Sequence, residues 1–314
     1  MTLPGPVVAI VGPTASGKSA LAELVAGQLG SPVVSVDAMQ VYRGMDVGTA
    51  KTPVAERRVP LLMVDMVDVS EEYSVQRFQA GARACVDGLL AKGRVPVLCG
   101  GTGLYLNAVV DEMIFPHGKR GGEARGRWEA FAAARGADAL HAELARRDEA
   151  SAELIHPNNV RRVVRALEML DEGVSYAEHH AGLHERAAHY DARIWGLTMD
   201  RQRLYERIDR RVDIMVEAGL VDEVKGLATR GLGRETSAGQ AIGYKEILDA
   251  LSGACSMAEA VEQVKLRSRR YAKRQLSWFR HDARVHWIDL DETSPEEASS
   301  RILADVRESS DGAL

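Results

Sequence analysis

The sequence predicts an α/β fold: a parallel sheet core with helices on both faces, interrupted by a mainly α-helical insertion. Three observations predict it. Short apolar runs alternate with helical stretches, a glycine-rich loop joins the first run to the first helix, and the middle of the chain lacks strand patterning. We expect residues 1–113 to form the first part of the core, 114–192 the insertion and 193–314 the second part of the core.

Val7–Val11 is a continuous apolar, β-branched run and predicts a strand buried on both faces, because such a strand shows no polar alternation. Strand character also predicts strands at Pro32–Val36, Leu61–Val64, Val95–Cys99, Arg193–Thr198 and Val285–Leu290. Apolar residues at helical spacing predict helices from about Lys18 to Gly30, over Val75–Ala91, and at about 200–229 and 256–281.

The stretch from about Ile114 to Ala192 shows helical periodicity without strand patterning, as in Val160, Val163 and Leu167. Gly118–Gly126 is rich in glycine and basic residues and predicts a linker. Glu308–Leu314 predicts a polar, frayed tail. The histidines show no convincing metal-ligand spacing and are interpreted as surface residues; they are His141, His156, His179, His180, His184 and His189.

Composition restricts the class of protein. Hydrophobic residues make up 46% and charged residues 27% of the 314 residues, which is typical of a globular chain with a buried core. The net charge of −5 does not imply a nucleic-acid partner, so any basic surface must be local. Three widely spaced cysteines support neither a disulfide framework nor a zinc site, and reduced thiols fit a cytoplasmic location. No run is long enough for a membrane span, so no membrane partner is expected.

A complete Gly-x-x-x-x-Gly-Lys-Ser motif lies between the first strand run and the first helix, and it predicts a P-loop NTPase-like core. Its backbone N–H groups and the helix N-terminus would attract phosphate oxygens. Lys18 would neutralise phosphate charge, and the Ser19 hydroxyl would ligate Mg²⁺. The residues assigned to this phosphate site are Gly12, Pro13, Thr14, Ala15, Ser16, Gly17, Lys18 and Ser19.

Two further loops follow strand runs and should meet the phosphate loop, because ligands bind at the carboxyl edge of an open parallel sheet. Two interpretations of Asp37 are favoured equally. In one it is a base or a metal ligand, and in the other it is a helix N-cap or turn residue. Gly100–Gly103 either approaches a ligand closely or forms a tight turn. The run before Gly100 does not end in an acid, whereas Leu61–Val64 is followed by Asp65, so a kinase or ATPase stays open.

Basic residues concentrate near the C-terminus, against the acidic total. The aromatic residues Tyr271, Trp278 and Phe279 lie among them. This pattern favours nucleic-acid binding over a plain solvated helix face, because cations contact phosphates and rings stack on bases. Arg269, Arg274 and Arg280 are candidate phosphate contacts within the basic set Lys265, Arg267, Arg269, Arg270, Lys273, Arg274, Arg280 and Arg284; a second cluster is Arg161, Arg162 and Arg165.

An ordered set of motifs extends from about Val7 to Asp289. Its members are Gly12–Ser19, Asp37–Tyr42, Gly44–Lys51, Gly100–Tyr105, His156–Arg162, Arg207-Ile208 with Arg211-Val212, Gln240–Glu246, Ala272–Gln275 and Trp278–Arg280. The set resembles the bacterial tRNA dimethylallyltransferase family. Two positions depart from the usual pattern of that family: Leu61-Leu62 stands where two histidines are usual, and Ala38 stands where a serine is common.

The resemblance implies transfer of a dimethylallyl group from dimethylallyl diphosphate to N6 of the adenosine 3′-adjacent to the anticodon (position 37) in tRNA, assisted by Mg²⁺. It implies binding of the tRNA anticodon stem-loop, with a channel that admits the base and the diphosphate from opposite ends. We expect a monomer. Asp37, Lys18 and Thr14 would be catalytic, and Arg207 and Arg211 would bind diphosphate. The implied tRNA contacts are Asp37, Ala38, Met39, Gln40, Thr102, Arg161, Arg162, Val163, Val164, Arg165, Gln240, Gly243, Tyr244, Lys245, Lys273, Arg274, Gln275, Trp278 and Arg280.

Three alternatives remain at this stage. A small-molecule prenyltransferase acting on free adenine nucleotides would share the core but would not need so broad a basic surface. A P-loop kinase would consume ATP. An RNA-binding module whose loop only senses a nucleotide would form no prenylated product.

Overall fold

The computed structural model describes residues 6–115, 122–182 and 187–311. The chain divides into two compact units, which we call the core unit (Met1–Asp111 with Ala188–Leu314) and the insertion unit (Glu112–Ala187). These borders lie a few residues before the expected ones at 113/114 and 192/193. Residues 118–121 of the expected linker, and His184, lie outside the described residues.

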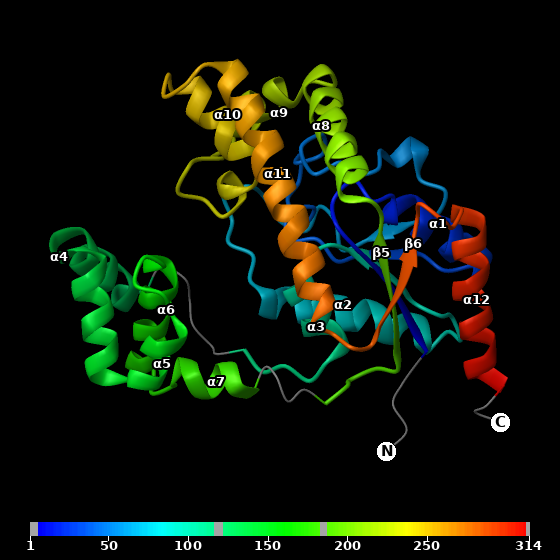
Figure 1. Ribbon diagram of the computed structural model, residues 1–314, viewed down its shortest axis with the longest axis horizontal. Coiled ribbons are helices and arrows are strands. Elements are labelled where there is room, and N and C mark those ends of the chain that lie inside the picture. The colour runs from blue at the N-terminus through cyan, green and yellow to red at the C-terminus, as the bar shows by residue number, and fades with distance from the viewer. Residues whose placement is uncertain (1–5, 116–121, 183–186, 312–314) are drawn as a thin grey trace. The chain divides into compact units, whose positions relative to one another are not determined.

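Six parallel strands form the sheet of the core unit, in the order β3-β2-β4-β1-β5-β6. They are β1 (Val7–Val11), β2 (Val33–Ser35), β3 (Leu61–Leu62), β4 (Val97–Gly100), β5 (Ala192–Thr198) and β6 (Val285–Asp289). Figure 1 shows the neighbouring strands β5 and β6 side by side. Each of the six strands overlaps a predicted run, and the α/β fold class is confirmed. β3 is shorter than predicted because the backbone turns away at Met63 and Asp65, whose φ angles are 61° and 57°.

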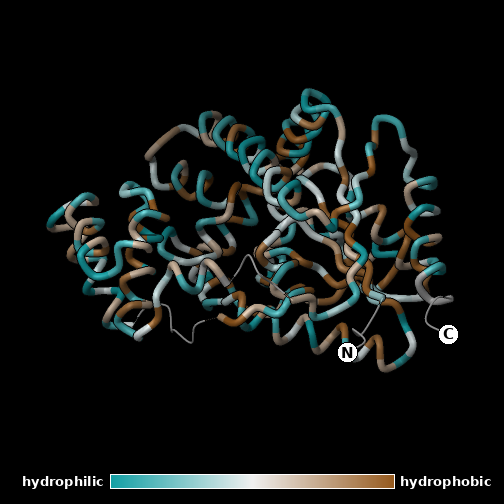
Figure 2. The backbone as a smooth tube through the Cα atoms, turned by 60° about the horizontal axis from the view of Figure 1, so that its bottom comes forward, coloured by the Kyte–Doolittle hydropathy of each residue, from teal (hydrophilic) through white to brown (hydrophobic). Residues whose placement is uncertain are grey.

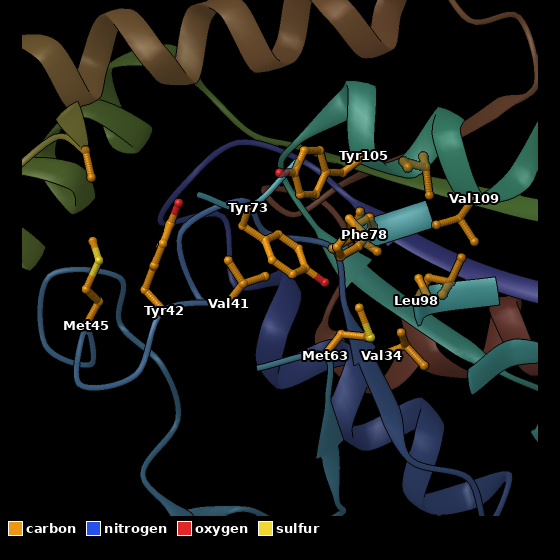
Figure 3. Packing of buried hydrophobic residues seen from close by; sticks show 14 of the residues in the cluster. Val34, Val41, Tyr42, Met45, Met63, Tyr73, Phe78, Leu98, Tyr105 and Val109 are labelled. Carbon is orange, nitrogen blue, oxygen red and sulfur yellow. The ribbon is translucent and has the colours of Figure 1, made fainter. Parts of the chain in front are cut away.

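Helices cover both faces of the sheet. Successive side chains of β1 point to opposite faces and pack against different helices. Val8 and Ile10 pack in a cluster with α1 (Lys18–Gln28) and α12 (Pro295–Asp311). Val7 and Ala9 point to the opposite cluster, which includes α2 (Val75–Leu90) and α3 (Gly103–Val110). Figure 3 shows part of that second cluster, where the rings of Phe78 and Tyr105 lie side by side with centroids 4.3 Å apart.

The C-terminal half of the core unit is helical between its two strands. It contains α8 (Arg201–Glu217), α9 (Leu220–Ala228), α10 (Tyr244–Leu251) and α11 (Met257–Arg280), besides the short 3₁₀ turn η2 (Ala238–Gln240). The other short 3₁₀ turn, η1 (Val54–Glu56), lies between β2 and β3. The predicted helix at 200–229 is two helices, because Gly219 adopts a φ of 96° between them. The hydrophobic segments gather around the sheet, while α8 and α11 carry many hydrophilic residues (Figure 2).

The end of the chain corrects one prediction. Glu308–Asp311 continues α12 rather than fraying, and the rest of the predicted tail, residues 312–314, lies outside the described residues. α12 was not predicted as a helix, although Ala298, Ile302 and Val306 repeat at helical spacing and are buried against α1.

The insertion unit is built from α4 (Glu123–Arg147), α5 (Glu149–Leu154), α6 (Val160–Asp171) and α7 (Tyr176–Gly182). Its core includes Trp128, Leu140, Leu144 and Leu167. α4 kinks at Gly136, where φ is 84°, and it begins inside the expected linker, so that prediction is wrong for Glu123–Gly126. Across the described ranges of both units, no helix is long and apolar enough to cross a membrane.

Candidate functional site

The phosphate loop is held in shape by contacts with two distant helices. Lys18 Nζ donates to Pro13 O at 3.2 Å, and Arg207 Nε of α8 donates to Ala15 O at 2.9 Å. The Thr14 backbone N–H donates to Gln275 Oε1 of α11 at 2.8 Å. The loop therefore keeps its curved form through α8 and α11, with the side chains of Lys18 and Ser19 at the start of α1.

Asp37 starts a turn two residues after the end of β2. Its Oδ1 accepts from the backbone N–H groups of Met39 at 2.8 Å and Gln40 at 3.3 Å. Among the described residues Asp37 Oδ2 has no hydrogen-bond partner. One oxygen therefore acts as the cap that the sequence allows, while the other remains available for a proton or a ligand.

The loop Gly100–Gly103 provides close packing for α11. A Cβ on Gly101 would lie 2.0 Å from Gln275 Nε2, and one on Gly103 would lie 2.1 Å from the Trp278 ring. Gln275 Nε2 donates to Gly101 O at 3.0 Å, while its Oε1 binds the phosphate loop. The glycines thus act as the tight turn that the sequence allows and let α11 reach both loops at the sheet edge.

The three loops meet around a cavity of about 360 Å³ in the core unit. Its lining includes the predicted site residues Thr14, Lys18, Ser19, Asp37, Ala38, Met39, Gln40, Thr102, Arg211, Gln240, Gly243, Tyr244, Arg274 and Gln275. A second hollow of about 400 Å³ is lined by Arg207, Arg210 and Arg211 together with Gly17. Lys18, Ser19, Ala50 and Arg211 line both spaces, so the cavity and the arginine-lined hollow adjoin at the phosphate loop.

Charges around the cavity are mostly positive on one side. Burial lowers the pKa of Lys18, and burial lowers the pKa of Arg211 while the Asp37 carboxylate opposes that shift. Both groups have therefore lost hydration that an anion would replace. Burial, and then the carboxylate of Asp37, raises the pKa of Tyr271 to about 12. Tyr271 keeps its proton near neutral pH and can act as a hydrogen-bond donor.

Sequence reasoning missed Tyr271 as a cavity residue. It lines the cavity with Ser268, Arg274 and Gln275 of the same helix, at helical spacing. That spacing was a usable signal, since Tyr271 lies three residues after Ser268 and four before Gln275, on one face of the helix. The pKa of Cys99, another lining residue, is raised to about 11 by burial, so its thiol stays protonated.

Part of the positive charge of the basic helix α11 is paired within the protein, at Lys265, Arg267 and Arg269. Arg269 Nη1 donates to both carboxylate oxygens of Asp209, at 2.6 and 2.5 Å, so it ties α11 to α8 and is not an available phosphate contact. Lys265 pairs with Asp213, and Arg267 with Glu246. Arg284 pairs with the buried Asp111 outside the helix. Lys273, Arg274, Trp278 and Arg280 remain exposed, with the Trp278 side chain 45% exposed.

Several implied contacts are corrected by burial. Val163 and Val164 are fully buried in the core of the insertion unit, so their side chains do not face solvent, whereas Arg161 and Arg162 of the same helix are exposed and Arg165 is half-buried. Gln275 is 5% exposed, and both the oxygen and the nitrogen of its side-chain amide bind backbone groups of the two loops. We therefore assign it the role of holding these loops in place. Tyr244 is buried too, and Lys245 is half-buried outside the cavity lining.

The remaining carboxylates are also placed. Asp46 and Asp65 each pair with Lys51 Nζ at 2.6 Å. Neither carboxylate is among the residues that line the cavity. Leu61–Leu62 forms the edge strand β3, and the Ala38 backbone N–H donates to Thr102 Oγ1 at 3.3 Å, a contact that needs no particular side chain at position 38.

Comparison with known families decides what this chain is. A family model described as IPP transferase matches residues 40–282, and one described as isopentenyl transferase matches residues 5–59. The chain belongs to the IPP transferase family. The resemblance read from the motifs is therefore confirmed.

Individual members of the IPP transferase family match nearly the whole chain. It is 48% identical over 307 residues to a tRNA dimethylallyltransferase of Kineococcus radiotolerans, with 95% of each chain covered. A solved tRNA isopentenylpyrophosphate transferase of Bacillus halodurans is 45% identical with a TM-score of 0.70, over 97% of this chain and 98% of that one. A eukaryotic dimethylallyltransferase, described in crystallographic snapshots as acting on tRNA, is 27% identical with a TM-score of 0.77, over 95% of this chain and 77% of that one.

Proposed function

We propose that this chain transfers the dimethylallyl group of dimethylallyl diphosphate to N6 of the adenosine at position 37 of tRNA, next to the anticodon, and releases diphosphate. The observation that carries the proposal is the shared lining of the cavity and the hollow by Lys18, Ser19 and Arg211. A diphosphate held there would present its allyl carbon to a base in the cavity, beside Asp37. Family membership supports the same reaction.

The chemistry assigns different tasks to the two sides of the cavity. The N6 amine attacks the allyl C1 carbon, the C1–O bond to diphosphate breaks, and the N6 proton passes to Asp37 Oδ2. The departing diphosphate gains negative charge, which Lys18, Arg211 and the loop N–H groups stabilise in place. Because the adenine amine is a weak nucleophile, a base that takes its proton as the bond forms lowers the barrier.

Magnesium would complete the diphosphate site. No group of three or more His, Cys, Asp or Glu able to hold a metal lies in the described ranges. The Ser19 hydroxyl, which lines both the cavity and the hollow, fits a Mg²⁺ that is otherwise held by the substrate's own phosphate oxygens and water, since Mg²⁺ keeps several waters and binds substrate phosphates. Ser19 is the residue we assign to that hydroxyl ligand. The bound ion would neutralise the leaving diphosphate.

A direct test is incubation of the protein with tRNA, dimethylallyl diphosphate and Mg²⁺, followed by mass analysis of the nucleosides. We expect dimethylallyl-adenosine at position 37, formed without ATP. ATP consumption with no prenylated product would instead indicate a kinase. Prenylation of free adenosine monophosphate in preference to tRNA would indicate the small-molecule enzyme, and tRNA binding without any product would indicate a binding module.

The free and paired cations of α11 lead to opposite expectations for tRNA binding. Arg274→Ala should weaken binding and reduce the slope of log affinity against log salt by about one, because one phosphate contact is lost. Arg269→Ala should leave that slope unchanged and lower the melting temperature, because its partner Asp209 loses a half-buried ion pair. Filter binding across salt concentrations, with a thermal melt, measures both. Equal salt slopes for the two variants would contradict the division of α11 into free and paired cations.

Basic groups elsewhere support the same partner. Arg161 and Arg162 are exposed on α6 of the insertion unit, and we assign them to the anticodon stem. Only local basic surfaces are needed, in keeping with the net charge of −5. We also propose that the protein works as a monomer, which sedimentation of the free protein would test.

A further inference from the structure

One carboxylate binds an entire loop beside the cavity. Glu223, in the first turn of α9, accepts the backbone N–H groups of three consecutive residues: Asp46 at 2.9 Å and Val47 at 2.7 Å through Oε2, and Gly48 at 3.1 Å through Oε1. The Tyr244 hydroxyl of α10 donates to the same Oε1 at 2.5 Å. These four bonds use about the full accepting capacity of a carboxylate, so Glu223 is committed to this loop.

Tyr244 fixes the position of the loop by packing as well as by its hydroxyl. It is fully buried, and a Cβ on Gly48 would lie 2.5 Å from its ring, so the loop backbone lies flat against that ring. Burial and the Glu223 carboxylate raise the pKa of Tyr244 well above its ordinary value. The hydroxyl therefore remains a donor to Glu223 throughout the neutral pH range.

The loop that Glu223 holds forms part of the reaction site. Gly48, Thr49 and Ala50 line the cavity, and Ala50 also lines the arginine-lined hollow. Ala50 has a φ of 46°, a left-handed conformation that is costly for a residue with a Cβ and persists only when its surroundings impose it. The wall between the two spaces is therefore strained backbone that depends on outside contacts.

The same loop connects to the turn of Asp37. Thr49 O accepts from Gln40 Nε2 at 3.3 Å, and Gln40 in turn donates its backbone N–H to Asp37 Oδ1 and accepts from Ser35 Oγ through its side-chain oxygen. A shift of the loop would move Thr49 O and loosen Gln40. The position of Glu223 is thus coupled to that of Asp37 through Gly48, Thr49 and Gln40.

The base of the loop has a separate anchor. Lys51 is buried and its Nζ binds Asp46, Asp65 and the carbonyl of Tyr42. Loss of Glu223 would therefore free the middle of the loop, Val47 to Ala50, while both of its ends stay attached. The expected defect is local rather than a collapse of the core.

We propose that Glu223 is a positioning residue for the transfer reaction: it holds the loop Asp46–Ala50 so that the cavity wall and the Asp37 turn are aligned to the acceptor base. The inference rests on the proposed function. Diphosphate binding depends on other groups, Lys18 and the arginines of α8. The bonds from Glu223 to the loop therefore affect the placement of the acceptor base and the chemical step.

The test compares Glu223→Ala with wild type and with Asp68→Ala. Asp68 is a matched control, because it too is a carboxylate that links the segment around the loop to the segment around α9. It pairs with Arg43 before the loop and with Arg230 after α9, but it is about half exposed and does not line the cavity. In Glu223→Ala, amide hydrogen exchange at Asp46, Val47 and Gly48 should quicken about tenfold or more, while β1 stays protected. Single-turnover transfer to tRNA should slow about ten- to hundredfold, with inorganic diphosphate binding within about twofold of wild type.

Asp68→Ala should keep the wild-type transfer rate and the wild-type exchange of residues 46–48. Should Glu223→Ala fail to fold, Glu223→Gln keeps the size of the side chain and permits the same comparisons, with one oxygen still accepting. A transfer rate within about twofold of wild type, despite faster loop exchange, would overturn the proposal while leaving the function intact. A loss of diphosphate affinity as large as the loss of rate would overturn it as well. If the wild-type protein forms no prenylated tRNA, the proposed function is wrong, and the proposed role of Glu223 is wrong as well.

Discussion

Lys18→Ala is expected to slow the chemical step about a hundredfold or more, because one charged contact to a leaving group contributes about 3 kcal/mol to the barrier. Lys18 lines both the cavity and the arginine-lined hollow. Burial has already removed part of its hydration, as its lowered pKa indicates, so little reorganisation is needed when diphosphate charge develops. Single-turnover kinetics with saturating dimethylallyl diphosphate and tRNA measure the effect.

Lys225→Ala is the matched control for Lys18→Ala. Lys225 lies on the surface of α9, where it pairs with the exposed Asp222. Its removal should leave the rate unchanged, since exposed pairs contribute little. The affinity for tRNA should be close to wild type in both variants. A Lys18→Ala enzyme that turns over within a few-fold of wild type would place the donor away from the phosphate loop.

The strands and the phosphate loop could be predicted from sequence because their signals are local. Val7–Val11 is apolar on both faces, and the loop that follows it carries a motif whose glycines and lysine lie within eight residues of one another. Asp37 was placed at the sheet edge for the same reason, since it lies two residues past the end of β2 and lines the cavity with the phosphate loop. Rules that join a strand end to a ligand site apply without knowledge of distant contacts.

Contacts between residues far apart in the chain could not be predicted from the sequence. Arg269 and Arg274 look alike in a basic helix, yet Asp209 of α8 neutralises the first and leaves the second exposed. Gln275 sits among cations, but it faces the phosphate loop and Gly101 because the glycines allow α11 to come close. Val163 and Val164 lie beside exposed arginines and are nevertheless core residues, as helical periodicity itself would indicate.

Asp37 combines two roles whose separation sets up the sharpest experiment. Its Oδ1 stabilises the turn by accepting from Met39 and Gln40, and its Oδ2 is the proposed proton acceptor. Asn at this position keeps an oxygen that can accept the two backbone bonds but cannot take a proton at neutral pH. Ala removes both functions. The pair of variants therefore distinguishes the turn from the chemistry.

We expect Asp37→Asn to slow the chemical step about a hundred- to ten-thousandfold while tRNA and diphosphate still bind and the melting temperature stays near wild type. Asp37→Ala should lose a similar amount of rate and also melt earlier, by the equivalent of about 1 kcal/mol, because the cap is gone. If Asp37 instead binds Mg²⁺, donor affinity should fall in the Asn variant and higher Mg²⁺ should partly restore the rate. Single-turnover kinetics at two Mg²⁺ concentrations, with a thermal melt beside them, separate these outcomes. An Asp37→Asn rate within a few-fold of wild type at both concentrations would leave Asp37 only as a turn residue, and the base would have to be sought elsewhere along the cavity.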